Sequence, residues 1–142
     1  MEFSMEVAQE LAASWAEQVR QYVAEHPTTT AAEIETSLRK ALQQVGVECL
    51  GKSLTALDAP YPPATVACSC GGQANYYYRR QGQILSVFGW VHYRRAYYVC
   101  PTCHAGRYPV DEQYQLQPGK VSGSLGSLLA LLVHSQASCA EM

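Results

Sequence analysis

Two pairs of cysteines are the residues best able to do chemistry in this chain of 142 residues. The first pair lies in Cys68-Ser69-Cys70-Gly71-Gly72 and the second in Cys100-Pro101-Thr102-Cys103. Two tight turns that each supply two thiolates provide the four soft donors that zinc binds as a tetrahedron. The two glycines let the backbone fold beneath a metal without a Cβ clash, and the proline pre-sets the second turn. The spacing therefore predicts a structural Zn²⁺ held by Cys68, Cys70, Cys100 and Cys103.

The cysteines and their neighbours also admit roles other than this site. Cys100-x-x-Cys103 alone is also the spacing of a redox pair, but such pairs usually open a helix, whereas this one follows a predicted strand. His104 is expected beside the metal or in solvent, because four thiolates already complete the ligand set. Cys49 and Cys139 fall in helical patterns and are expected to be small core residues.

Positive charge and tyrosine are concentrated in the middle third of the chain. The formal charge is −2 overall, but it is −5 over residues 1–58, +5 over residues 59–110, which contain no acid, and −2 over residues 111–142. Arginine and tyrosine both donate to phosphate, and tyrosine also stacks, so this stretch is predicted to bind a polyanion, with DNA the leading partner. The predicted DNA contacts are Arg79, Arg80, Arg94 and Arg95, supported by Tyr77, Tyr78, Tyr97 and Tyr98. The alternative is a half-buried sheet whose tyrosines fill a thin core and whose arginines are simply solvated.

The elements before these residues follow a helical period. Apolar residues recur every three or four positions over residues 4–25, which predicts an amphipathic helix. Thr30 and Glu33 form a capping box that begins a second helix, and Gly46 is predicted to end it. Leucines over residues 50–57 suggest a short third helix.

After a proline-rich segment the period changes to that of strands. Residues 74–80, 84–88 and 90–99 are rich in aromatic and β-branched residues, with turn signals at Gln81-Gly82 and Gly89, and this pattern predicts a small antiparallel meander. The expected segments are a helical region 1–58, a linker 59–66, a zinc ribbon 67–110, a loop 111–121 and a C-terminal helix 122–142 capped by Ser122 or Ser124. The predicted fold class is α+β: N-terminal helices, a small antiparallel zinc β-ribbon and a C-terminal helix.

Membrane and catalytic roles are not expected. The longest mostly apolar run, residues 127–133, is far shorter than the roughly 20 residues that cross a bilayer, and no secretory signal is visible, so a soluble cytoplasmic protein is predicted. The acids after residue 58 are only Asp111, Glu112 and Glu141, too few for two-metal phosphoryl chemistry. The chain also has no P-loop, dinucleotide fingerprint or nucleophile elbow, so we expect no enzymatic activity.

A string of motifs runs from Cys68 to Glu112. It consists of Cys-x-Cys-Gly-Gly, Tyr78-Arg79-Arg80, Val87-Phe88-Gly89, Arg94-Arg95-Ala96-Tyr97-Tyr98-x-Cys100-x-x-Cys103, Gly106, Pro109 and Asp111-Glu112. This string resembles the N-terminal part of bacterial insertion-sequence transposases of the ISKra type, which are DDE-class enzymes. The resemblance continues more loosely through Leu116, Pro118-Gly119, Ser122 and the leucine-rich segment 125–132, and covers about half of the chain. Departures are Ser86 in place of threonine, Trp90 where proline is common and His92 where a basic residue is common.

The resemblance implies a DNA-binding zinc-ribbon module of a transposase, truncated before the catalytic domain. In the family a ribonuclease-H-like domain with a carboxylate triad follows, and Mg²⁺ is expected only in that missing domain. The implied partners are double-stranded DNA of an insertion sequence and, through the terminal helices, the full-length transposase or a second copy. The alternative is a zinc-ribbon adaptor that binds a protein partner without DNA.

Overall fold

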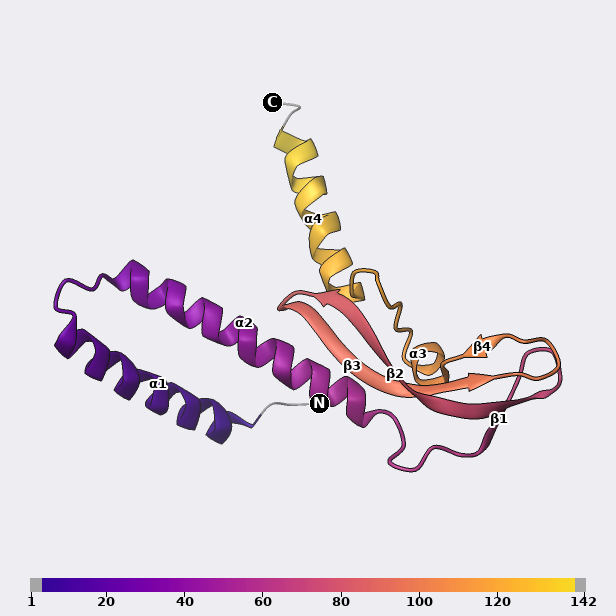
Figure 1. Ribbon diagram of the computed structural model, residues 1–142. Coiled ribbons are helices and arrows are strands. Elements are labelled where there is room, and N and C mark those ends of the chain that lie inside the picture. The colour runs from indigo at the N-terminus through magenta and orange to yellow at the C-terminus, as the bar shows by residue number, and fades with distance from the viewer. Residues whose placement is uncertain (1–3, 140–142) are drawn as a thin grey trace. The chain divides into compact units, whose positions relative to one another are not determined.

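Helices precede and follow an antiparallel sheet along this chain, so the fold is α+β as the sequence predicts (Figure 1). The computed structural model describes residues 4–139, with side chains described as far as residue 132. The elements in chain order are α1 (Met5–Glu25), α2 (Ala31–Ala56), β1 (Thr65–Ala67), β2 (Gln73–Ser86), β3 (Gly89–Val99), β4 (Gly106–Arg107), α3 (Pro109–Gln113) and α4 (Gly123–Cys139). The four strands pair in the order β1-β2-β3-β4.

The chain divides into two compact units, residues 1–41 and 42–142. In the first unit the predicted capping box is confirmed, since the Thr30 N–H donates to Glu33 Oε2 at 2.7 Å and the Glu33 N–H donates to Thr30 Oγ1 at 3.3 Å. Trp15 and Ile34 help to line a groove of about 690 Å³ within this unit. None of the described residues up to residue 41 is buried, so the apolar stripe of α1 stays half exposed.

Gly46 does not end a helix, and the prediction of a second helix that ends there and a separate short helix over residues 50–57 was wrong. The helix α2 continues through Gly46 and Gly51 to Ala56. A Cβ at Gly46 would lie 2.4 Å from the ring of Phe88, and one at Gly51 would lie 2.8 Å from the carbonyl oxygen of His92. These glycines therefore serve close packing of the helix against the hairpin rather than helix termination. Residues 42–56 belong to the same compact unit as the sheet. The boundary expected after residue 58, between the helical region and the linker, therefore lies inside that unit.

The predicted antiparallel meander is confirmed, but its strands differ from those expected: β2 and β3 form one long, curved hairpin (Figure 1), because the predicted strands 74–80 and 84–88 are a single strand. No turn occurs at Gln81-Gly82, because Gly82 lies within β2 opposite Tyr93. A Cβ at Gly82 would lie 2.9 Å from Cζ of Tyr93, so this glycine makes room for a buried ring. The turn predicted at Gly89 is confirmed: Ser86 pairs with Gly89, whose φ is 125°.

Two small clusters form the core of the second unit. The first contains Cys68, Ala74, Ala96, Tyr98 and Cys100, and the second contains Leu54, Ile84, Val91 and Tyr93. The segment predicted as a loop begins instead inside the short helix α3, in whose first turn Asp111 and Glu112 lie.

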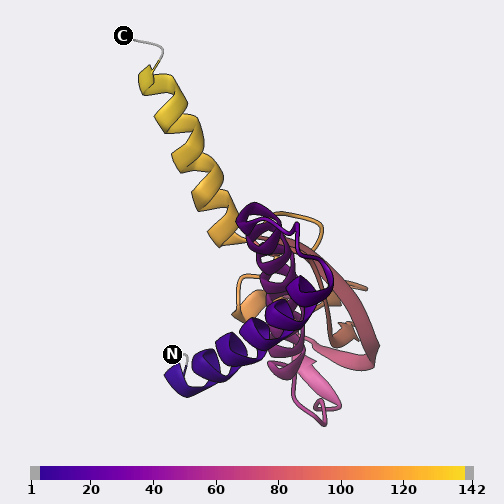
Figure 2. The ribbon, with the colours of Figure 1, turned by 90° about the vertical axis from the view of Figure 1, so that its left-hand side faces the viewer.

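The predicted C-terminal helix is confirmed over Gly123–Cys139, and its last three predicted residues, 140–142, lie outside the described residues. Ser122 caps the helix by accepting a hydrogen bond from the Leu125 N–H at 3.2 Å. α4 runs as a single straight helix (Figure 2). Its leucines Leu128, Leu129 and Leu131 are exposed. Among the helices of the described residues, none has the length and apolar character to cross a membrane.

We expect Gly51→Ala to destabilise the protein although alanine favours helices. Replacing glycine by alanine in a helix stabilises it by about 1 kcal/mol through helix propensity. The new Cβ would, however, lie 2.8 Å from the His92 carbonyl oxygen, and this backbone atom cannot move away without disturbing the strand. A net loss of about 1–3 kcal/mol in the free energy of unfolding is expected from overpacking of this kind. Urea denaturation followed by circular dichroism measures it.

Gly126→Ala in α4 is the matched control. Its Cβ would meet only Val121 at 3.9 Å, an ordinary van der Waals distance. Its free energy of unfolding should therefore stay level or rise by up to about 1 kcal/mol. Equal effects of the two substitutions would contradict a packing role for Gly51.

Candidate metal centre and nucleic-acid interface

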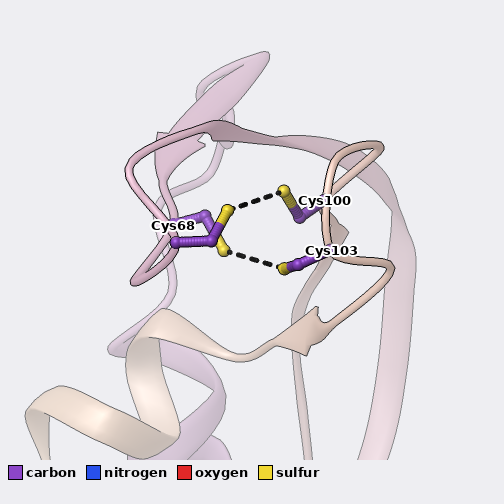
Figure 3. Close-up of side chains that lie close together, drawn as sticks. Cys68, Cys100 and Cys103 are labelled. Atoms are coloured by element: carbon purple, nitrogen blue, oxygen red, sulfur yellow. Dashed lines mark hydrogen bonds between the residues drawn. The ribbon is translucent and has the colours of Figure 1, made fainter.

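The four predicted ligands converge at one end of the sheet. Cys68 Sγ lies 3.6 Å from Cys103 Sγ, Cys70 Sγ lies 3.6 Å from Cys100 Sγ, and all four sulfurs lie within 4.8 Å of one another. Figure 3 shows Cys68, Cys100 and Cys103 turned toward one another from two facing turns. A disulfide needs about 2.05 Å between sulfurs, whereas a tetrahedral metal with Zn–S distances of about 2.3 Å separates them by about 3.8 Å. The cluster therefore could hold a metal ion such as zinc.

The backbone of each turn is shaped for this convergence. In the first turn the Cys68 N–H donates to the Gly72 carbonyl at 2.9 Å, and Gly71 takes a φ of 85°, which favours glycine. A Cβ at Gly72 would lie 3.1 Å from Thr102 Oγ1 in the facing turn, which is tighter than an ordinary contact, and 3.4 Å from Cys70 Sγ. The two glycines therefore have different roles: Gly71 allows the positive φ of the turn, and Gly72 leaves space for the facing turn.

The second turn follows the same plan without a glycine. The Cys100 N–H donates to the Ala105 carbonyl at 3.0 Å, and the His104 N–H donates to the Cys100 carbonyl at 2.8 Å. His104 adopts a φ of 58° and is exposed, so its backbone closes the turn while its side chain faces solvent.

The electrostatics of the cluster favour a bound cation. The Cys103 N–H donates to the Cys100 sulfur and lowers the pKa of that thiol to about 6, and the Cys70 N–H lowers the pKa of Cys68. The Ala105 N–H acts to lower the pKa of Cys103, but the sulfurs of Cys68 and Cys70 outweigh it and raise this pKa to about 11. Close thiolates repel one another, so they ionise together only if a positive charge compensates them.

Four protein ligands leave no open position on a tetrahedral metal, which is the arrangement of structural sites. Cys68 and Cys100 are buried in the first core cluster, while Cys70 and Cys103 are exposed. Cys49 lies away from the cluster and is exposed, so its prediction as a core residue was wrong. The side chain of Cys139 lies outside the described residues.

Three of the five arginines of the acid-free stretch are neutralised. Each one pairs with an acid that lies just outside the stretch in sequence, and the fold brings the two together. The pairs are Arg79 with Asp58 at 3.3 Å, Arg95 with Asp111 at 2.9 Å, and Arg107 with Glu112. The segregation of charge along the sequence therefore overstates the positive charge of the folded surface.

Arg95 and Tyr98 are buried, with exposed fractions of 3% and 2%, and cannot contact DNA in this fold. Arg95 Nε donates to Asp111 Oδ2, and the Tyr93 hydroxyl donates to Asp111 Oδ1 at 2.8 Å. The Tyr98 hydroxyl donates to the Pro63 carbonyl at 3.0 Å. Burial, followed by the hydrogen bond to Asp111, raises the pKa of Tyr93. Tyr93 and Tyr98 thus fill the thin core that the alternative predicted, but Arg95 is not solvated as that alternative had it, because its guanidinium forms the buried ion pair with Asp111.

The other predicted contacts divide between the two faces of the hairpin. Arg80 and Tyr97 share one face, where the Arg80 guanidinium lies 5.7 Å from the centre of the Tyr97 ring, while Arg79 and Arg94 lie on the other. Tyr77 and Tyr78 are exposed beside Tyr97. The side chains of Arg80 and Arg94 are free of carboxylate partners within the described residues.

Sequence reasoning missed Tyr108. Its ring stacks on Tyr97 at 4.8 Å between centres, its hydroxyl accepts a hydrogen bond from Arg80 at 3.1 Å, and the Arg95 guanidinium lies 4.2 Å from its centre. No local pattern marks it, because its place depends on how the chain returns after the second cysteine pair.

Comparisons with protein-family models, with curated proteins and with solved structures found no match to this chain.

We expect Cys100→Ser to lose the metal. Wild-type protein should retain about one zinc ion per chain after dialysis, and the variant should bind zinc at least tenfold more weakly, since a hydroxyl is a far poorer ligand than a thiolate. Competition with a coloured chelator measures the affinity. Cys49→Ser is the control and should bind as the wild type does; equal affinities of both variants would place the metal elsewhere or nowhere.

Asp111→Ala should lower the free energy of unfolding by about 3–5 kcal/mol, because it leaves the Arg95 guanidinium buried without its partner. Glu112→Ala, which removes the neighbouring carboxylate from an exposed ion pair, should cost at most about 1 kcal/mol. Urea denaturation of both variants with zinc present makes the comparison, and a small effect at Asp111 would show that the buried pair is dispensable.

Proposed function

We propose that this chain is a DNA-binding zinc-ribbon module. The observation that carries the proposal is a solvent-exposed surface on which a cation without a carboxylate partner lies among tyrosine rings. Arg80 adjoins Tyr97, and Tyr77 and Tyr78 extend the surface along the start of β2. Arginine binds phosphate and tyrosine stacks on bases or donates to phosphate, so this pairing of residue types suits nucleic acid.

The metal we propose is Zn²⁺, and its role is structural. Four thiolates at tetrahedral spacing are the donor set that zinc prefers. The cluster of core residues around it is small, so the metal would supply stability that burial of apolar surface cannot.

The context we propose is a transposase, on the strength of the motif string from Cys68 to Glu112. In this context the chain recognises insertion-sequence DNA in the bacterial cytoplasm and leaves catalysis to a separate domain. The ion pairs support a non-catalytic role, since Asp111 and Glu112 are engaged with arginines and are not free to hold Mg²⁺. The exposed leucines of α4 support the further expectation that a terminal helix contacts a full-length transposase or a second copy.

A protein-interaction adaptor is the second candidate function. The neutralisation of Arg79, Arg95 and Arg107 favours it, because it removes most of the positive charge on which DNA attraction depends. An adaptor would show no salt-dependent affinity for DNA.

Fluorescence anisotropy of the zinc-loaded protein with a labelled duplex that carries a single-stranded tail tests the proposal. We expect binding at low salt that is lost when a chelator removes the metal. Arg80→Ala should weaken binding about tenfold, the value of one charge-assisted hydrogen bond. Arg39→Ala makes the same change of charge on an exposed arginine of the first unit and serves as the control. No binding by protein that retains its zinc would favour the adaptor.

A further inference from the structure

We infer that the surface around Tyr77 is a stacking platform for unpaired bases, so that the preferred ligand is a single-stranded or unpaired segment of nucleic acid rather than a continuous duplex. The inference rests on the proposed function and names its substrate class. The tyrosine platform is defined as Tyr77, Tyr78, Tyr97 and Tyr108, with Arg80 beside it.

The charges on this face are too few for duplex binding by phosphate contacts alone. Arg80 and Arg94 are the two arginines of the ribbon without a carboxylate partner in the described part of the chain, and they lie on opposite faces of the hairpin. Even if both contacted phosphates, a plot of the logarithm of the affinity for duplex DNA against the logarithm of the salt concentration would have a slope of only about −2. Proteins that make many phosphate contacts give slopes of about −6 or steeper. Strong binding on this surface must therefore draw on another interaction.

Tyr77 offers that interaction because of a β-bulge. The register of β2 against β3 shifts between Tyr76 and Tyr78, which makes Tyr77 the extra residue. A bulge leaves its extra residue out of the ladder and re-aims its side chain. The residue Tyr77 is 69% exposed, and its ring meets those of Tyr78 and Tyr97 only edge-on, at 5.1 and 6.4 Å between ring centres. Much of its surface is therefore available to a ligand.

The rest of the platform is held rigidly from beneath. Tyr97 stacks on Tyr108 with 28° between the rings, and the Arg95 guanidinium lies against Tyr108. Arg95 is itself fixed by the buried ion pair with Asp111. A Cβ at Gly106 would lie 2.5 Å from the Tyr97 hydroxyl, so the chain there is shaped around this ring. A rigid platform loses little conformational entropy when it binds.

Stacking requires that a base expose its face. Bases inside a duplex cover both faces with their neighbours, whereas unpaired bases stack freely on aromatic side chains, each contact contributing about 1–3 kcal/mol. Arg80 lies where it can hold a phosphate beside a base stacked on the platform, since its guanidinium adjoins both Tyr97 and Tyr108. The combination of stacking rings and one cation matches single-strand recognition.

The experiment compares a labelled single-stranded DNA, the same sequence as a blunt duplex, and the same sequence as single-stranded RNA, each titrated with the full zinc-loaded chain. We expect at least tenfold tighter binding of the single strands than of the duplex, and a shallow dependence on salt. Tyr77→Ala should weaken single-strand binding by about 5- to 150-fold, and Tyr77→Phe should preserve it, because stacking needs the ring and not the hydroxyl. Tyr61→Ala removes a tyrosine that is 91% exposed outside the platform and should have no effect.

Each outcome decides between the inference and the function on which it rests. Tighter binding of the duplex, or an unchanged affinity of Tyr77→Ala for single strands, overturns the inference and leaves DNA binding standing. Tighter binding of the RNA strand keeps the platform and overturns DNA as its ligand. No binding of any oligonucleotide by folded protein that retains its zinc overturns both.

Discussion

Four sulfurs that cannot all ionise next to one another are the constraint on which the ribbon depends. The core cluster at this end of the sheet contains only five residues, and two of them are the candidate ligands Cys68 and Cys100. So small a cluster cannot offset the conformational entropy of two turns and the strands between them. A shared cation would offset the mutual repulsion of the thiolates and would join the turn before β2 to the turn after β3.

A network of arginines extends from this end of the sheet toward the other elements. Arg107 donates to the carbonyl of Ala67, next to Cys68, and pairs with Glu112 of α3. The adjacent Asp111 turns inward, where it pairs with Arg95 and accepts the hydroxyl of Tyr93. The acids at the start of α3 therefore attach this helix to the sheet. The same pairs neutralise cations that would otherwise have attracted a polyanion, and this is why stacking outweighs charge in the proposed mode of binding.

The tyrosine platform is linked to this scaffold through one guanidinium. Arg95 lies between the carboxylate of Asp111 and the ring of Tyr108, and Tyr108 supports Tyr97. The order of the surface thus depends on a residue that no ligand can reach. Among the described residues, the helices α1 and α4 show the opposite character, since their apolar residues are largely exposed, and this agrees with the proposed role of the terminal helices in assembly.

The sequence by itself determined the features that short-range chemistry controls. The capping box at Thr30 and the cap of α4 by Ser122 each depend on a few neighbouring residues, so the pattern was enough to predict them. The spacing within each cysteine pair predicted the four candidate ligands, and the β2–β3 hairpin brings the two pairs together. Only the tertiary structure decided the roles of Gly46 and Gly82, which are glycines because Phe88 and Tyr93 approach them from distant positions. It also decided which arginines are free: a count of charges along the chain cannot reveal that acids flanking the sheet fold back onto Arg79, Arg95 and Arg107, because ion pairing depends on distance in space and not in sequence.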